Sequence, residues 1–436
     1  NTVKTSYRPS ANAMRIEIPI DWLSVQHDGF YTIDFSFPNG DPLSLRVMPR
    51  DHSLPAVSKL SFDGVPQPAI LSLNIMQVSP TLFGMRQGVL IGAAFALAVA
   101  LVSLIKGSKK KMRAAVCLII LFAPLAVMGY LFSYDDWGIA DWDYYIALHD
   151  SYRKAIIEHH TFPFWDPYPC GGTAGLADPE FPLFSPTFLL EFVFGVPQGV
   201  KLAIVLTVIV GAIGMLQLAR SLGRSVEASL IASLAVAFGT VNLLEVTEGH
   251  VNIFAAMWIP WIFWAWLGAY RGTKKPIICG IFLALTFLGG GIYLLMYTTL
   301  AFIGLLFLTK NVRKAIQTTA ISALWALGFS AFKLVPVLFW LTQFPDDGYI
   351  ASTYTLPWIV DILFGRHLHG SYIIAGQDSG WHEYGAYVGY GVLALALIGA
   401  SRIRNNRVVR GLVIATVVSI IVSTLGPQLQ PIFDHL

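Results

Sequence analysis

The sequence predicts an all-α polytopic membrane protein with about ten transmembrane helices, preceded by a small β-rich domain. Of its 436 residues, 55% are hydrophobic and only 13% are charged, whereas soluble domains carry about 25% charged residues. The apolar residues occur in blocks of about 16–22 residues, which is the length a helix needs to cross a bilayer. A soluble enzyme, a disulfide-rich secreted protein, a disordered chain and a nucleic-acid binder are therefore poor fits.

Residues 1–84 differ from the rest of the chain. Apolar and polar residues alternate over Arg15–Ile20 and Phe30–Phe37, and Pro38–Pro42 supplies turn residues, a pattern typical of strands joined by tight turns. We expect a β-rich domain of about four to six strands here. Because Asn1 stands where an initiator methionine would, with no signal peptide before it, we expect a truncated or processed start.

Ten apolar runs predict the transmembrane helices. They fall at residues 87–105, 112–133, 198–219, 226–243, 253–270, 276–289, 293–309, 315–341, 384–400 and 411–425. Residues 85–111 are thus an extra helix with a cytoplasmic loop, and 112–436 form the main transmembrane domain. A shorter run, Phe184–Val196, is bounded by prolines and contains Glu191, so we interpret it as interfacial or re-entrant.

The distribution of basic residues orients these helices. Of the 29 Lys and Arg residues, 17 lie in five clusters: Lys106–Arg113, Arg220 with Arg224, Arg271–Lys275, Lys310–Lys314 and Arg402–Arg410. With ten spans, all five clusters fall on one face, which the positive-inside rule makes cytoplasmic. In a bacterial inner or plasma membrane, the N-terminal domain and two long loops, 134–197 and 342–383, are then extracytoplasmic. Long ordered loops are usually functional.

Two acids at the start of the first loop are candidate catalytic residues. Asp141 and Asp143 follow the second span closely and precede a stretch, 144–159, with the apolar spacing of a helix lying in the membrane interface. Trp142 and Tyr144 suit headgroup depth. One of these acids could act as a general base, or the pair could bind a divalent metal. The alternative is that they solvate the loop and cap the helix.

The segment that follows, 161–186, is dense in proline, glycine and aromatic residues. We expect neither helix nor strand there. Trp165 and Asp166 are candidate substrate-binding residues, and Gly171 and Gly172 would let the backbone approach a ligand closely. The alternative is a rigid plug that packs the ends of the spans.

At this point the chain resembles a known family. The motifs that carry the resemblance are Asp141–Tyr145, Phe162–Gly172, Phe194–Gly195 with Gly199–Leu202, Glu248–His250 before Trp258–Trp261, Gly289–Tyr293 and Glu383–Gly391. Over about residues 135–400 the chain is similar to GT-C-like bacterial membrane glycosyltransferases, the YfhO-like and dolichyl-phosphate-mannose-transferase-like proteins. The resemblance implies a GT-C-like fold, a polyprenyl-phosphate-linked sugar donor, transfer at the extracytoplasmic face, and Asp141 or Asp143 as the base.

The remaining candidates would bind the substrate. Glu248 and His250 lie where a predicted span reaches the outer surface, and Arg366 and Glu383 belong to the second long loop. An arginine there could pair with phosphate. Lys333 lies within an apolar run, and a charge within the membrane is a functional hypothesis by default. No cofactor is certain, and a divalent metal is the one candidate.

Two other functions stay open. The N-terminal domain and the extra span at 87–105 depart from the family pattern, which favours a non-catalytic accessory subunit of a larger membrane complex. A lipid or sugar-lipid transporter is the third hypothesis, although no internal repeat is visible. The expected partners are a polyprenyl-phosphate-linked sugar, membrane lipids and other membrane subunits, with no nucleic acid.

Overall fold

The computed structural model describes most of the chain from residue 109 onward and four short strands before it. The described residues are 31–35, 43–47, 59–62, 65–67, 109–133, 141–168, 172–306, 309–343, 355–365, 385–387, 389–404 and 406–424. The chain divides into two units, one comprising residues 1–86 and 130–137 and the other comprising 87–129 and 138–436. Each unit is described separately.

The first unit contains a four-stranded antiparallel sheet in the order β1-β2-β3-β4. The strands are β1 (Tyr31–Phe35), β2 (Leu43–Val47), β3 (Lys59–Phe62) and β4 (Val65–Gln67). In the first hairpin Tyr31 lies opposite Val47. The strands fall in the region where the sequence predicts β structure. Most of 1–84 lies outside the described residues, so the domain as a whole stays a prediction.

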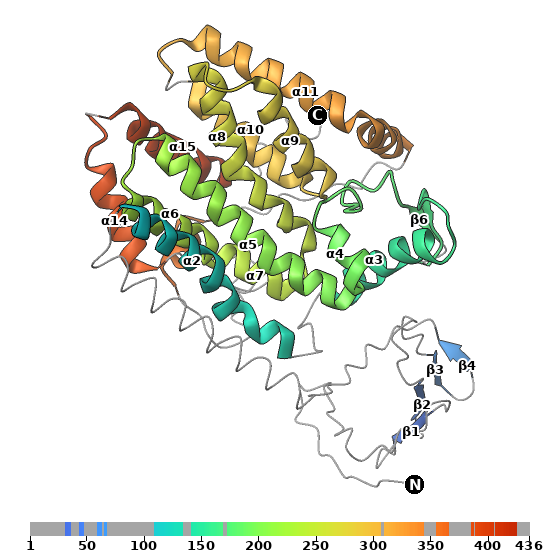
Figure 1. The fold of residues 1–436 in the computed structure, drawn as a ribbon. Coiled ribbons are helices and arrows are strands. Elements are labelled where there is room, and N and C mark those ends of the chain that lie inside the picture. Colours follow the sequence, from blue (N-terminus) through green and yellow to red (C-terminus); the bar gives the residue numbers. More distant parts are fainter. Residues whose placement is uncertain are drawn as a thin grey trace. The chain divides into compact units, whose positions relative to one another are not determined.

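The second unit is helical (Figure 1). Its helices are α2 (Lys109–Met128), α3 (Trp142–Ile157), α4 (Phe188–Phe194), α5 (Val196–Ser221), α6 (Val226–Ala237), α7 (Thr240–Glu248), η3 (Val251–Trp258, a 3₁₀ helix), α8 (Ile259–Arg271), α9 (Pro276–Leu288), α10 (Ile292–Leu306), α11 (Val312–Gln343), α12 (Leu356–Phe364), α14 (Tyr390–Ala400) and α15 (Arg407–Thr424). The 3₁₀ helix η2 (Gly129–Ser133) follows α2 in the sequence, and its residues 130–133 belong to the first unit. The helix predicted over 144–159 corresponds to α3.

Among the residues that the structure describes, three helical stretches are long and apolar enough to cross a membrane: Val196–Ser221, Val251–Arg271 and Val312–Gln343. Six shorter apolar helices accompany them, and their exposed surfaces are rich in leucine, isoleucine, valine and phenylalanine. This is the pattern of a helical membrane protein, as the sequence predicts. The predicted span 87–105 lies outside the described residues, and the total of ten spans stays a prediction.

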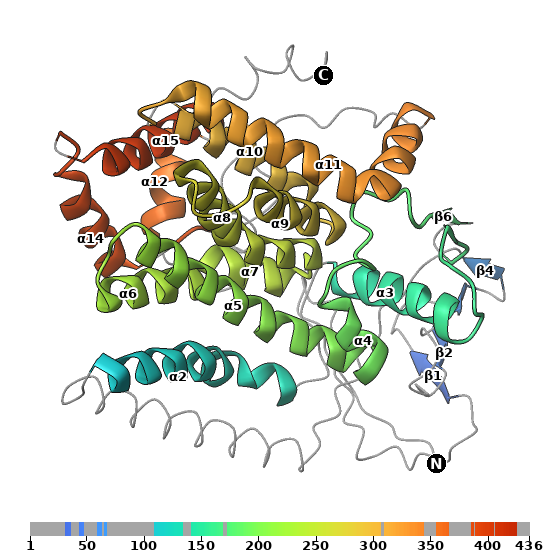
Figure 2. The ribbon, with the colours of Figure 1, turned by 45° about the horizontal axis from the view of Figure 1, so that its top comes forward.

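Within this unit α5 packs against α4, α6 and α8, and α9 packs along α11 (Figures 1 and 2). Close approach depends on glycine, because a Cβ on Gly280 of α9 would lie 2.5 Å from the Trp325 Cβ of α11. A Cβ on Gly214 of α5 would lie 2.6 Å from the Trp261 ring. Small residues at helix contacts are typical of membrane helices, which associate by close packing.

Residues 141–195 contain α3, α4 and the chain between them. That connecting chain includes a pair of short antiparallel strands, β5 (Trp165–Asp166) and β6 (Thr173–Ala174). The expectation of no strand in 161–186 is therefore wrong at these residues. The paired residues fall between the prolines, at positions where the backbone N–H groups are present. Elsewhere between residues 175 and 187 the described backbone forms turns, as expected. We call residues 141–195 the α3–α4 segment.

Candidate functional site

The start of α3 lies directly against the end of α7. Asp141 is the N-cap of α3, and its backbone N–H donates to the carbonyl oxygen of Glu248 at 2.9 Å. Gly249 has φ +90°, and a Cβ there would lie 2.5 Å from the Trp142 nitrogen. Glycine adopts a positive φ without strain, and its lack of a Cβ lets the two backbones approach this closely. Two motifs about a hundred residues apart in sequence are thus brought together.

His250 lies between two carboxylates at this junction. Its Nδ1 is 2.5 Å from the Glu245 Oε2, and its Nε2 is 3.4 Å from the Asp141 Oδ2. A protonated imidazole would contact both acids. The Asp141 side chain is 53% exposed and that of His250 is 26% exposed, so solvent screens the pair and its contribution to stability is small. We call these three residues the Asp141–His250–Glu245 row.

Asp143 has different surroundings from Asp141. It lies exposed in the first turn of α3, and residues two apart on a helix do not face each other. Trp142 is buried, whereas Tyr144 is half exposed. Within the described ranges, no group of three or more His, Cys, Asp and Glu side chains could hold a metal ion. Metal binding by Asp141 and Asp143 stays a prediction.

Two acids that the sequence does not predict as site residues, Asp178 and Glu180, lie close to α3. Glu180 accepts hydrogen bonds from the Tyr145 hydroxyl at 2.6 Å and from the Asn252 Nδ2 at 2.8 Å, so it joins α3 to η3. The pKa of Asp178 is raised to about 6, chiefly by burial and also by the charge of Glu180, although the hydrogen bond from the Glu180 backbone N–H and the charge of Lys333 oppose the shift. Burial and the surrounding acids also raise the pKa of Tyr144.

Lys333 of α11 binds the backbone next to these two acids. It is fully buried, and its Nζ donates to the carbonyl oxygens of Pro179 at 2.9 Å, Phe181 at 2.8 Å and Phe287 at 3.3 Å. An ammonium group has three hydrogens to donate, and three backbone carbonyls accept them. These contacts favour a positioning role for Lys333 over contact with a substrate phosphate.

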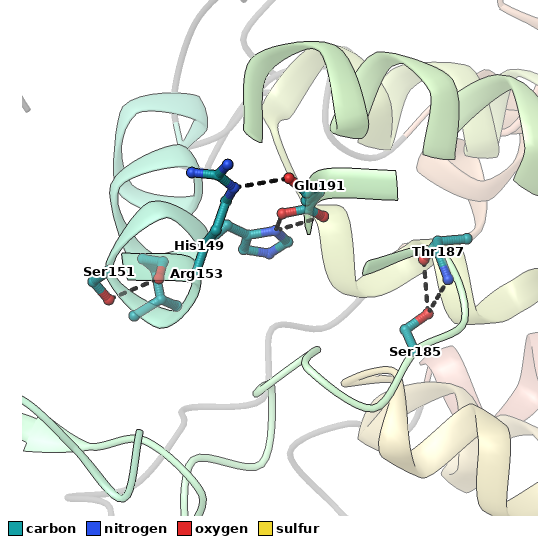
Figure 3. A network of polar contacts seen from close by, with 7 residues as sticks. His149, Ser151, Arg153, Ser185, Thr187 and Glu191 are labelled. Carbon is teal, nitrogen blue, oxygen red and sulfur yellow. Dashed lines mark hydrogen bonds and ion pairs between the residues drawn. The ribbon is translucent and has the colours of Figure 1, made fainter. Parts of the chain in front are cut away.

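α3 is joined to α4 by a buried polar contact (Figure 3). The Nδ1 of His149 lies 2.8 Å from the Glu191 Oε2, and the Nε of Arg153 donates to the Glu191 carbonyl oxygen at 2.9 Å. Both His149 and Glu191 are at most 3% exposed. Burial raises the pKa of Glu191, although His149 and Arg153 oppose the shift. The run 184–196 is therefore tied to α3 by Glu191.

The hairpin brings Trp165, Asp166 and Gly172 together. Asp166 is buried and accepts from the Ser151 hydroxyl at 2.7 Å and the Tyr168 backbone N–H at 3.1 Å. Gly172 has φ +111°, and a Cβ there would lie 2.4 Å from the Trp165 ring. The close approach of glycine backbone that the sequence predicts is thus made to a tryptophan of the same hairpin. Gly171, Arg366 and Glu383 lie outside the described residues.

Of the site residues predicted from the sequence, Asp141, Trp142, Glu248 and His250 lie together in the structure. Asp178, Glu180 and Glu191 are not among the site residues that the sequence predicts. Asp178 and Glu180 stand in an Asp-Pro-Glu sequence within a segment of turns, and such a sequence alone does not indicate which residues they contact.

In comparisons with family models, curated proteins and solved structures, nothing matches this chain. The resemblance to GT-C-like glycosyltransferases therefore stays a prediction from the sequence motifs.

Proposed function

We propose that this chain is a membrane glycosyltransferase that moves a sugar from a polyprenyl-phosphate-linked donor to an acceptor on the extracytoplasmic face. The observation that carries the proposal is the junction between the start of α3 and the end of α7. There Asp141, the candidate base, lies 3.4 Å from His250, and the Asp141 backbone is hydrogen-bonded to Glu248. Both sides of the junction come from motifs of the family that the sequence resembles.

In this proposal Asp141 removes the proton from an acceptor hydroxyl. The hydroxyl oxygen attacks the anomeric carbon of the donor sugar, the bond from that carbon to the phosphate oxygen breaks, and the polyprenyl phosphate leaves with the bonding electrons. His250, held by Glu245 at 2.5 Å, can accept the proton from Asp141 and pass it to solvent. A base in hydrogen-bond reach of a group that exchanges protons with water can be reset for the next turnover.

Asp143 is the alternative base. It is exposed at the first turn of α3, and it has no comparable imidazole beside it in the part of the chain that the structure describes. The arrangement therefore favours Asp141 as the base. Arg366 stays the proposed contact for the departing phosphate, since Lys333 donates to three carbonyls.

Transfer assays with matched variants test this proposal. The full chain in proteoliposomes is given polyprenyl-phosphate-linked glucose, mannose and N-acetylgalactosamine in turn, and the release of free polyprenyl phosphate is measured. Asp141→Asn is expected to lower the rate by about 10²-fold or more, as loss of a general base does. Glu158→Gln, which changes an exposed acid at the other end of α3, is the control and is expected to keep the rate.

The two candidate bases and the alternative function give different results. A large loss in Asp143→Asn with full activity in Asp141→Asn would move the base to Asp143. Undiminished release by the double variant would remove both acids from the mechanism. If the wild-type protein releases no polyprenyl phosphate from any donor and copurifies with other membrane proteins in fixed stoichiometry, the accessory-subunit function replaces the transferase.

A further inference from the structure

A cavity of about 230 Å³ lies beside the C-terminal half of α3, between the helix and residues 159–168. The polar and aromatic side chains that line it are Ser151, Tyr152, His159, Thr161, Trp165, Asp166 and Tyr168. Ser151 is ten residues beyond Asp141 on α3, which corresponds to about 15 Å at 1.5 Å per residue. The cavity is therefore separate from the Asp141–His250–Glu245 row.

Tyr152 is one of the residues that line the cavity, and it carries a buried hydroxyl group. The side chain is 0% exposed, and its ring packs edge-on against Phe181 with a centroid distance of 4.5 Å. Its hydroxyl has no hydrogen-bond partner among the residues described. Buried polar groups in proteins are nearly always paired, so a buried hydroxyl without a partner needs an explanation. A ligand in the adjoining cavity provides one.

Asp166 and Trp165 supply the other two kinds of contact. Asp166 is 2% exposed and is fixed by its bonds to Ser151 and Tyr168, yet each carboxylate oxygen can accept a second hydrogen bond. Trp165 is 53% exposed, and Gly172 packs against its ring. The ring is thus held in place while part of its surface stays open to a ligand.

These side chains determine the class of ligand. A buried carboxylate beside the cavity disfavours an anion, because like charges repel strongly where water is scarce. Four residues with hydroxyl groups and one with an imidazole line the cavity, and such groups can donate or accept hydrogen bonds, which suits a ligand with many hydroxyls of its own. The indole face suits an apolar ring surface. A sugar ring presents hydroxyls at its edge and C–H groups on its faces.

We propose that this cavity binds one neutral monosaccharide unit, with Tyr152 and Asp166 hydrogen-bonded to its hydroxyls and Trp165 against its ring. The proposal goes beyond the transferase function and does not depend on it, because the cavity would bind free sugar whether or not the chain transfers one. If both proposals hold, the acceptor is a saccharide long enough to reach from the cavity to Asp141.

Binding of free sugars to the full chain in detergent tests the proposal. Saturation-transfer NMR and thermal unfolding are measured with glucose, mannose and N-acetylglucosamine at millimolar concentrations, and with tetramethylammonium as the cationic probe. At least one sugar is expected to bind. Tyr152→Phe is expected to weaken binding about tenfold, the effect of one lost hydrogen bond to a ligand. Trp165→Ala, a change at an exposed side chain, is expected to weaken it by at least as much.

Tyr152→Phe also separates a binding role from a structural one. Since the hydroxyl has no partner in the described part of the chain, its removal is expected to leave the unfolding temperature of the sugar-free protein unchanged or higher. The control is Tyr270→Phe in α8, remote from the cavity in sequence and outside its lining, which is expected to keep wild-type sugar affinity. Absence of binding by all three sugars, wild-type affinity in both cavity variants, or binding of tetramethylammonium alone would each overturn the proposal.

Discussion

The two ends of α3 differ in how they are held. At the N-terminal end the contacts are ionic and partly exposed, because Asp141 and His250 both reach solvent. Over the rest of the helix the contacts are buried: His149 meets Glu191, and Ser151 meets Asp166. Exposed ion pairs contribute little to stability and can exchange partners readily, whereas buried polar groups are costly to leave unpaired. The first arrangement suits proton transfer, and the second suits fixing the helix in place.

Residues 178–181 contact both halves of α3, since Glu180 accepts from Tyr145 and Phe181 packs against Tyr152. Glu180 contacts Tyr145 of α3 and Asn252 of η3, and Lys333 holds the backbone on either side of Glu180. A change at Lys333 should therefore disturb the whole α3–α4 segment, whereas changes at the N-terminal end of α3 should be local.

Lys333→Met is expected to be the most destabilising change. Methionine has a similar length but no donor, so the carbonyls of Pro179 and Phe181 lose the bonds shown here, while that of Phe287 also accepts from the Gly290 N–H. We expect a loss of about 2–4 kcal/mol in the free energy of unfolding and faster proteolysis between residues 172 and 187. Thermal unfolding in detergent and mapping of the cleavage sites measure both effects.

Ser330→Ala on the same helix is the control for this change. Its hydroxyl donates only to the Ala326 carbonyl of α11 itself, so we expect an effect within about 0.5 kcal/mol. If Lys333→Met were as stable and as protease-resistant as Ser330→Ala, Lys333 would not hold the 178–181 chain, and a role in contacting substrate would become the better explanation.

Gly249→Ala tests the junction between α3 and α7. Alanine is strained at the positive φ of this position, and its Cβ would lie 2.5 Å from the Trp142 nitrogen. The two backbones must therefore separate. We expect a loss of about 2–3 kcal/mol. Gly223→Ala is the matched control, because Gly223 has φ +77° and a Cβ there meets nothing within 4 Å. It should lose about 1–2 kcal/mol, and equal losses in the two variants would argue against a close junction.

Much of the helical architecture could be predicted from the sequence, because the apolar runs are about as long as a helix must be to cross a bilayer. The apolar run at 198–219 is found within α5, and that at 315–341 within α11. The short strands at 165–166 and 173–174 could not be predicted, because a strand of two residues is too short to show an alternating pattern. The prolines nearby gave the stronger local signal.

The candidate site was predictable only where a motif marked it. Asp141 and His250 stand in short polar motifs at the ends of apolar runs, so their selection needed no knowledge of the fold. The partners of Tyr145 and His149 lie 35 and 42 residues away along the chain, and nothing in the sequence pairs them. Such contacts depend on how the chain after α3 folds back onto it, and the spacing of residues in the sequence does not show this.

Asp178 gives the α3–α4 segment a pH dependence. Its pKa is raised from 3.8 to about 6, so between these values the folded protein retains a proton that the unfolded chain has released. Stability from this group therefore falls as the pH rises through that window, and is lowest above about pH 6. Asp178→Asn, which keeps an acceptor for the Glu180 N–H, should gain about 1–2 kcal/mol at pH 8 and nothing at pH 4.

Unfolding temperatures measured from pH 4 to pH 8 check this prediction. The wild-type curve should fall more steeply than that of Asp178→Asn, and some slope should persist in the variant because the pKa of buried Glu191 is also raised. Parallel curves would mean that Asp178 is as well solvated in the folded protein as in the unfolded chain.

Asp143→Asn should have the smallest effect on stability, and for that reason it sharpens the contrast between the two ends of α3. The carboxylate is exposed in the first turn, where its charge interacts favourably with the helix dipole. We expect a loss of about 0.3 kcal/mol at low salt, and less at high salt because ions screen the charge. Unfolding measured at both salt concentrations tests this. A large, salt-independent loss would mean that Asp143 is held by a buried partner, and the N-terminal end of α3 would then resemble the rest of the helix.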